Sequence, residues 1–166
     1  QATRATAAHS TVSIDDKSSC TFRDGGLSHG IARGPEHVPS SRHTQDGRSW
    51  VEAEHDGYGP NVGLNHRRRL YLGEDGRDLR GEDTLSPKPG QRVRTGTAFA
   101  RFHLHPTVEA ANTDDGDSIT LNLPDGETWQ FRARGGATSL EDSVYVGQGK
   151  AAAARQIVIS APCEAD

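Results

Sequence analysis

Two histidines separated by a single residue form a pattern that suits metal binding. In His103-Leu104-His105, the alternation of an extended strand would put both imidazoles on one face, where such a pair can chelate a transition metal. The neighbouring sequence supplies no third ligand, and Pro106 ends the strand at once. A half-buried histidine pair on a sheet surface explains the pattern without an ion. We favour that interpretation because short motifs recur by chance.

A run of basic residues at positions 66–72 suggests a second kind of chemistry. In an extended strand, Arg67, Arg69 and Tyr71 would share one face. Guanidinium groups bind carboxylates and sulfates through paired hydrogen bonds, so this face suits an acidic polysaccharide as well as nucleic acid, and Arg67 and Arg69 are our candidate substrate-binding residues. We favour the alternative, in which these arginines pair with carboxylates of neighbouring strands. The acidic residues available for such pairing include Glu52, Glu54 and Glu74.

Strands must position these side chains, because strand-like patterns recur along the whole chain. They lie at residues 11–14, 18–22, 48–54, 62–72, 99–105, 118–123, 128–134, 143–146 and 156–160. Dipeptides such as Asp46-Gly47 and Asp125-Gly126 tolerate the positive φ angles of tight hairpin turns. The sequence therefore predicts an all-β fold, an antiparallel two-sheet β-sandwich of many short strands joined by Asp-Gly hairpins, as a single domain over residues 1–166.

The apolar residues of these strands predict the core. In 119–123 and 128–132 they alternate with polar residues on both arms of a hairpin, so one face should meet a core and the other water. The expected core members are Trp50, Leu70, Leu72, Phe102, Leu104, Leu121, Leu123, Trp129, Phe131, Val144, Val146, Ile157 and Ile159.

The composition narrows the classes of function. Aromatic residues make up 5% of the chain and the formal net charge is −4, which argues against a nucleic-acid partner. No apolar stretch approaches the roughly 20 residues of a membrane helix, so we expect no membrane partner. Neither a serine elbow nor a cysteine–histidine signature is present. Cys20 and Cys163 are compatible with a disulfide or with two free thiols.

Five segments follow one another along the chain: Ala7-Ala8-His9-Ser10-Thr11-Val12 with Ile14-Asp15-Asp16, then His55-Asp56-Gly57-Tyr58, the run at 66–72, Asp78-Leu79-Arg80-Gly81-Glu82-Asp83, and Phe102-His103-Leu104-His105-Pro106. In this order they resemble the C-terminal β-sandwich of bacterial heparinase II/III-like polysaccharide lyases, in particular the alphaproteobacterial branch. The chain also contains no methionine, so we expect it to be part of a larger protein.

The resemblance implies a parent lyase that cleaves uronate-containing acidic polysaccharides by β-elimination. Such a lyase has an N-terminal α/α toroid, absent from this chain, and a substrate cleft between the toroid and the sandwich. The resemblance also implies a periplasmic location and no catalytic residue in this chain, so the fragment alone should be inactive. His9 matches a histidine that binds zinc in some members, with its partner ligands upstream. A noncatalytic carbohydrate-binding domain and a purely structural domain are the alternatives.

Overall fold

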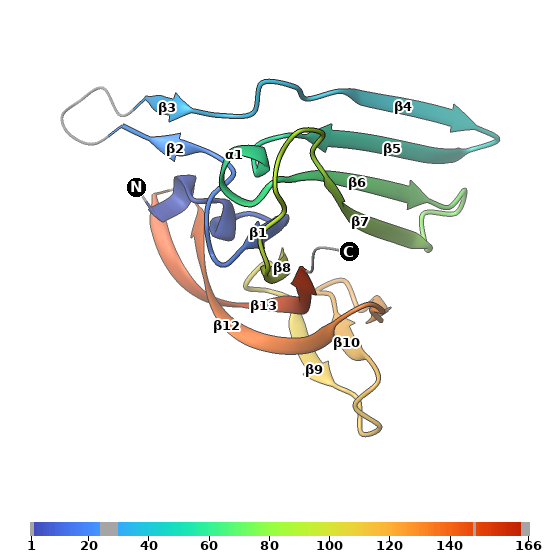
Figure 1. Ribbon diagram of the computed structural model, residues 1–166. Helices are drawn as coiled ribbons and strands as arrows, with labels where there is room; N and C mark the ends of the chain where they lie inside the picture. The colour runs from blue at the N-terminus through green and yellow to red at the C-terminus, as the bar shows by residue number, and fades with distance from the viewer. Residues whose placement is uncertain (1, 24–29, 148, 164–166) are drawn as a thin grey trace. The chain divides into compact units, whose positions relative to one another are not determined.

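The computed structural model describes residues 2–23, 30–147 and 149–163, and its regular structure is almost entirely antiparallel β-strand (Figure 1). This confirms the predicted all-β fold class. The helical elements are two 3-10 turns, η1 (Ala2–Arg4) and η2 (Thr6–Ala8), and the one-turn helix α1 (Gly59–Val62). Among the described residues, no helix has the length and hydropathy needed to cross a bilayer. By their contacts the residues form two compact units.

Unit 1 comprises Gln1–Lys17 and Thr97–Pro162. Its four-stranded sheet has the order β1 (Val12–Ile14), β8 (Gly96–His103), β13 (Lys150–Cys163) and β12 (Ala137–Gly147). Figure 1 shows β12 and β13 as a long curved pair. A second, three-stranded sheet has the order β11 (Thr128–Phe131), β10 (Ile119–Asn122) and β9 (Glu109–Asn112). The predicted hairpin is present as β10 and β11, with Leu121 opposite Trp129.

Unit 2 comprises Ser18–Gly96 and Cys163–Asp166. Its four-stranded sheet runs in sequence order through β4 (Ser40–Gln45), β5 (Arg48–His55), β6 (Leu64–Leu72) and β7 (Leu79–Pro87). Asp46 and Gly47 have φ angles of 48° and 73° in the two-residue turn between β4 and β5, as predicted for an Asp-Gly hairpin. A small sheet joins β2 (Thr21–Phe22) to β3 (Ile31–Arg33).

The core differs from the predicted one. Ile157 is fully buried as expected, but five predicted core residues are exposed: Trp50, Leu70, Leu72, Val144 and Val146. They lie toward the hairpin ends of their strands, where the apolar positions of the alternating pattern face solvent. The most buried apolar residues are Val12, Ile14, Ile119, Ile157 and Val158 in unit 1, and Tyr58, Val62, Leu64 and Cys163 in unit 2. Cys20 and Cys163 are not joined by a disulfide in the structure.

Candidate functional site

The strands of unit 1 gather histidines around one cavity of about 520 Å³. His103 ends β8, and His105 follows two residues later. Ser143 and Tyr145 come from β12, while His9 follows directly after η2. All five residues line the cavity. The structure therefore brings the sequence-predicted His9 to the same place as the H-x-H pair, and it adds Ser143 and Tyr145, which the sequence analysis missed.

His103 is held in one orientation by hydrogen bonds at both ring nitrogens. Its Nε2 lies 3.0 Å from the carbonyl oxygen of Ala7, which can only accept, so Nε2 carries a proton. In the neutral ring, Nδ1 then accepts from the Ser143 hydroxyl, 3.0 Å away. This imidazole connects β8 to the N-terminal segment and to β12. Its acceptor nitrogen is already used, so His103 is a structural residue of the cavity wall rather than a metal ligand.

His105 is exposed, and its acceptor nitrogen is also occupied. The backbone N–H of Thr107 donates to Nδ1 at 3.3 Å, and the Thr107 hydroxyl lies 2.8 Å from the same atom. Because Nδ1 accepts, the neutral ring carries its proton on Nε2. The ring also contacts Tyr145 edge to face, with centroids 4.9 Å apart. His105 thus presents an N–H donor beside an aromatic ring, and this tautomer does not suit metal binding through Nε2.

His9 is the remaining histidine of the cavity. It is exposed, and within the described part of the chain no hydrogen bond to its imidazole is found. Residues 2–23, 30–147 and 149–163 contain no cluster of ligand atoms that includes His9. The described residues of this chain therefore do not form a zinc site by themselves, and His9 would contribute a single ligand to one.

One cluster in unit 2 has the side chains of a metal site but a different role. The ligand atoms of Glu36, His37 and Asp56 lie within 4.8 Å of one another. Asp56 is buried, however, and it accepts the backbone N–H groups of Glu36 and His37 at 2.8 and 3.2 Å and the Lys88 ammonium at 2.8 Å. Lys88 first, and then these N–H groups, hold the pKa of Asp56 well below its usual range. The carboxylate therefore anchors the 36–37 segment and already has a cation.

The predicted substrate-binding arginines lie on the four-stranded sheet of unit 2, and both have carboxylate partners. Arg69 donates to Glu52, which is directly opposite on β5, and Arg67 lies 4.0 Å from Glu82 of β7. The pairing alternative is therefore present in the structure for Arg69 with its expected partner Glu52. Its guanidinium stays about half exposed, at 51% of the side chain.

The opposite face of β6 holds a partly buried network that the sequence analysis did not assign. Arg68 donates to Asp83 through Nε and Nη2, each at 2.7 Å, and His66 Nε2 lies 2.7 Å from the same carboxylate. Burial alone would raise the pKa of Asp83, but the bonds from His66 and Arg68 outweigh burial and lower it to about 2. His66 Nδ1 lies 3.3 Å from His55 Nε2, and burial lowers the pKa of His55, as does the neighbouring His66.

The hydrogen-bond partners at the two ends of this network decide which nitrogen of each imidazole carries the proton. The N–H of Gly57 donates to His55 Nδ1 at 3.2 Å, so the neutral His55 ring carries its proton on Nε2 and donates to His66. His66 then donates through Nε2 to Asp83. Both ends of the chain of imidazoles are occupied and His66 is buried, so the network has no free nitrogen for a substrate. It stabilises the sheet.

Comparisons with known proteins agree with this architecture. The chain matches the family model described as heparinase II/III-like, C-terminal, over residues 1–165. FtsZ-localized protein C of Caulobacter vibrioides is 36% identical over 162 residues, covering 92% of this chain and 28% of that protein. The crystal structure of heparan sulfate lyase HepC from Pedobacter heparinus has a TM-score of 0.67 at 14% identity, covering 96% of this chain and 22% of HepC. The crystal structure of a HepC mutant has a TM-score of 0.68 at the same 14% identity. The chain thus spans less than a third of each relative.

Proposed function

The chain belongs to the heparinase II/III-like, C-terminal family, and we propose that it is the β-sandwich part of a polysaccharide lyase that acts on acidic, uronate-containing polysaccharides. The cavity of unit 1 carries the proposal. His105 offers an N–H donor, Tyr145 an aromatic ring and His9 an exposed imidazole. Sugar hydroxyls and carboxylates accept hydrogen bonds, and the C–H face of a sugar packs on aromatic rings, so the cavity suits a glycan.

The chemistry of β-elimination defines what this cavity would contribute. A lyase must neutralise the C5 carboxylate, remove the C5 proton and protonate the leaving oxygen. The N–H of His105 fits the first task, because it can donate to a carboxylate. His103 cannot act as a base while Nδ1 accepts from Ser143. We propose that the base and the acid belong to the parent protein outside this chain, and that this domain borders the substrate cleft.

The experiment is an elimination assay on the full-length protein, read as the ultraviolet absorbance of the unsaturated uronate product. Heparan sulfate and alginate are the substrates. We expect turnover, and we expect His105→Ala to lower kcat/KM by about tenfold, the effect of one lost hydrogen bond to a charged group. His37→Ala is the matched control, because His37 is an exposed histidine of unit 2 whose backbone N–H, rather than its imidazole, donates to Asp56. Turnover that His105→Ala leaves unchanged would contradict the role of the cavity.

A second candidate function follows from the relative in Caulobacter. The name of that protein associates it with FtsZ and mentions no substrate, and its identity of 36% exceeds the 14% of the lyase structures. The alternative is therefore that the domain binds glycan or serves a structural role in a protein localised with FtsZ, without catalysis. Absence of turnover by the full-length protein on both substrates would favour this candidate.

Two further assignments belong to the proposal. His9 would share a zinc ion with residues outside this chain, and elemental analysis of the full-length protein should show zinc that His9→Ala loses; equal zinc in both proteins would remove the assignment. Arg67 and Arg69 would contact carboxylates or sulfates of the glycan. To do so, each guanidinium must exchange its present carboxylate partner for the ligand, so its net contribution is small.

A further inference from the structure

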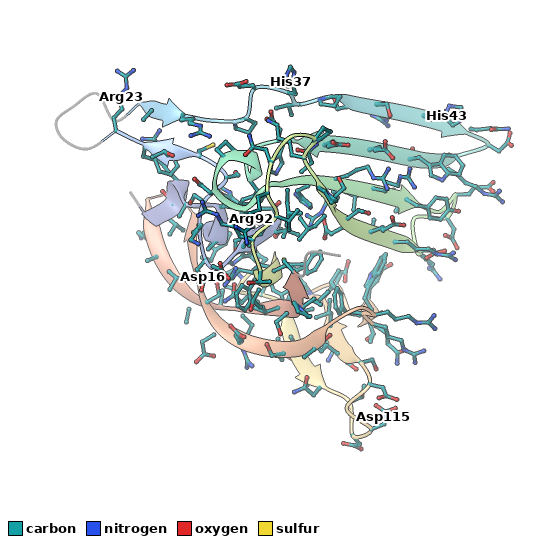
Figure 2. All side chains as sticks on the ribbon, viewed as in Figure 1. Asp16, Arg23, His37, His43, Arg92 and Asp115 are labelled. Carbon is teal, nitrogen blue, oxygen red and sulfur yellow. The ribbon has the colours of Figure 1, made fainter. Side chains whose placement is uncertain are left out.

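One face of the four-stranded sheet in unit 2 carries a row of three aromatic rings and one guanidinium group, with one member on each strand. Strand register places His43 opposite Trp50, Trp50 opposite Tyr71, and Tyr71 opposite Arg80. The ring centroids of His43 and Trp50 are 5.7 Å apart, those of Trp50 and Tyr71 are 5.3 Å apart, and the Arg80 guanidinium carbon lies 5.6 Å from the Tyr71 centroid. Figure 2 shows His43 on the outer strand β4. We call these four residues the aromatic row.

The aromatic row is open to ligands. Trp50, at its centre, keeps 38% of its surface exposed, and His43 and Arg80 are exposed. Cross-strand ring contacts stabilise a sheet, but they do not by themselves require large apolar rings to face water. A face with an exposed Trp between a His and a Tyr has the composition of a binding surface, because amphipathic rings are enriched where surfaces meet partners.

The charges beside the aromatic row balance one another. The next cross-strand row consists of Glu52, Arg69 and Glu82, in which Arg69 donates to Glu52. Arg80 itself donates to Asp78 at 3.0 and 2.6 Å through Nε and Nη2. The face as a whole offers little net field to attract an acidic group, because its arginines and carboxylates are equal in number: Arg48, Arg67, Arg69 and Arg80 against Glu52, Glu54, Asp78 and Glu82. Its free energy of binding must come mainly from the rings.

We propose that the aromatic row binds a polysaccharide through the uncharged faces of its sugar rings, as a second glycan-binding surface separate from the histidine cavity of unit 1. The inference takes only its ligand class, a polysaccharide, from the proposed function. Pyranose rings present C–H faces to aromatic rings, and this contact tolerates different sugars. The balanced charge complements a neutral ligand surface, and it argues against an acidic peptide or a nucleic acid as the occupant.

The test is titration calorimetry of the full-length protein with two neutral polysaccharides, xylan and laminarin. We expect binding to at least one of them, with an affinity that changes little between low salt and about 0.5 M salt, because screening acts on charges and not on stacking. Trp50→Ala should weaken binding roughly tenfold, the effect of losing one stacked ring with its buried area. Trp50→Phe, which keeps a ring, should recover most of the affinity.

Trp129→Ala is the matched control, because Trp129 is a half-buried tryptophan on β11 of unit 1. Binding that falls equally in Trp129→Ala and Trp50→Ala would overturn the proposal, as would the absence of binding to both polysaccharides or binding that salt abolishes. If Trp50→Ala does not fold, Tyr71→Ser with the same readout takes its place. Calorimetry measures binding and does not depend on turnover. A negative elimination assay therefore does not contradict binding at the aromatic row, and absence of binding at the aromatic row does not contradict a positive elimination assay.

Discussion

The two faces of strand β6 use the same residue type in two ways. Arg68 points to the opposite face, where 18% of its side chain is exposed and it donates two hydrogen bonds to Asp83. Arg67 and Arg69 point to the open face and make single, more exposed contacts with carboxylates. Alternation along one strand therefore separates a structural arginine from two that are free to exchange partners.

The comparison teaches that charge alone does not identify a binding residue in this domain. The run at 66–72 is uniformly basic in sequence, yet its middle arginine belongs to a closed network with His66 and Asp83. Removing one member of such a network leaves a buried charge without compensation, whereas removing an exposed member leaves a charge in water.

Asp83→Asn should produce the largest effect. The change leaves the Arg68 guanidinium without its carboxylate on the buried face, and we expect the free energy of unfolding to fall by about 3–5 kcal/mol. Urea denaturation followed by circular dichroism measures it. Asp78→Asn is the matched control, because Asp78 makes the same two-bond contact with Arg80 in solvent. Equal losses in the two variants would show that the buried network is not special.

Lowering the pH should remove the contribution of the same network to stability in two steps. The folded pKa of His55 lies below its ordinary 6.5, so the unfolded chain takes up the proton first and stability falls as pH drops below 6.5. Asp83 has a folded pKa of about 2 against an ordinary 3.8, so its contribution, about 2 kcal/mol, is present above 3.8 and is lost as pH falls through 2. Nuclear magnetic resonance titration of the two side chains gives these values directly. A His55 pKa at or above 6.5 would contradict the first step.

The open face should give the smallest effect. Arg67→Ala combined with Arg69→Ala should raise the KM of the full-length protein for an acidic polysaccharide severalfold and leave the fold intact, because each arginine only exchanges one carboxylate for another. The increase should shrink at high salt. Arg42→Ala with Arg77→Ala removes the same charge elsewhere in unit 2 and should leave KM unchanged. An equal rise in KM in both double variants would show that the effect comes from net charge and not from the positions of Arg67 and Arg69.

Much of the fold follows from the sequence, because each of the nine predicted strands overlaps a strand of the structure. The strands that the prediction lacks are β3, β4, β7 and β9. In β4 all six residues are exposed, so no alternation between apolar and polar residues marks it. Tyr58 and Val62, which are among the most buried residues, lie around the one-turn helix α1, which is too short to show a period.

The candidate sites were harder to predict, because they depend on pairing between distant segments. The H-x-H pair is visible in the sequence, but its contact with Ser143 depends on where β12 lies in the sheet. Tyr71 is part of the predicted basic face, yet its neighbours Trp50 and Arg80 follow only from the register of β5 and β7. Strand register depends both on the geometry of the turns and on which face of the strand is buried. The sequence pattern alone determines neither of these completely.

The central claim is that a glycan contacts the histidine cavity of unit 1. Histidine- and tyrosine-selective nuclear magnetic resonance of the full-length protein, titrated with a uronate oligosaccharide, tests it most directly. The account predicts that the resonances of His105 and Tyr145, which are in ring contact at the cavity, shift with saturation while that of His37 in unit 2 stays in place. A saturating titration that leaves His105 and Tyr145 unmoved would contradict it.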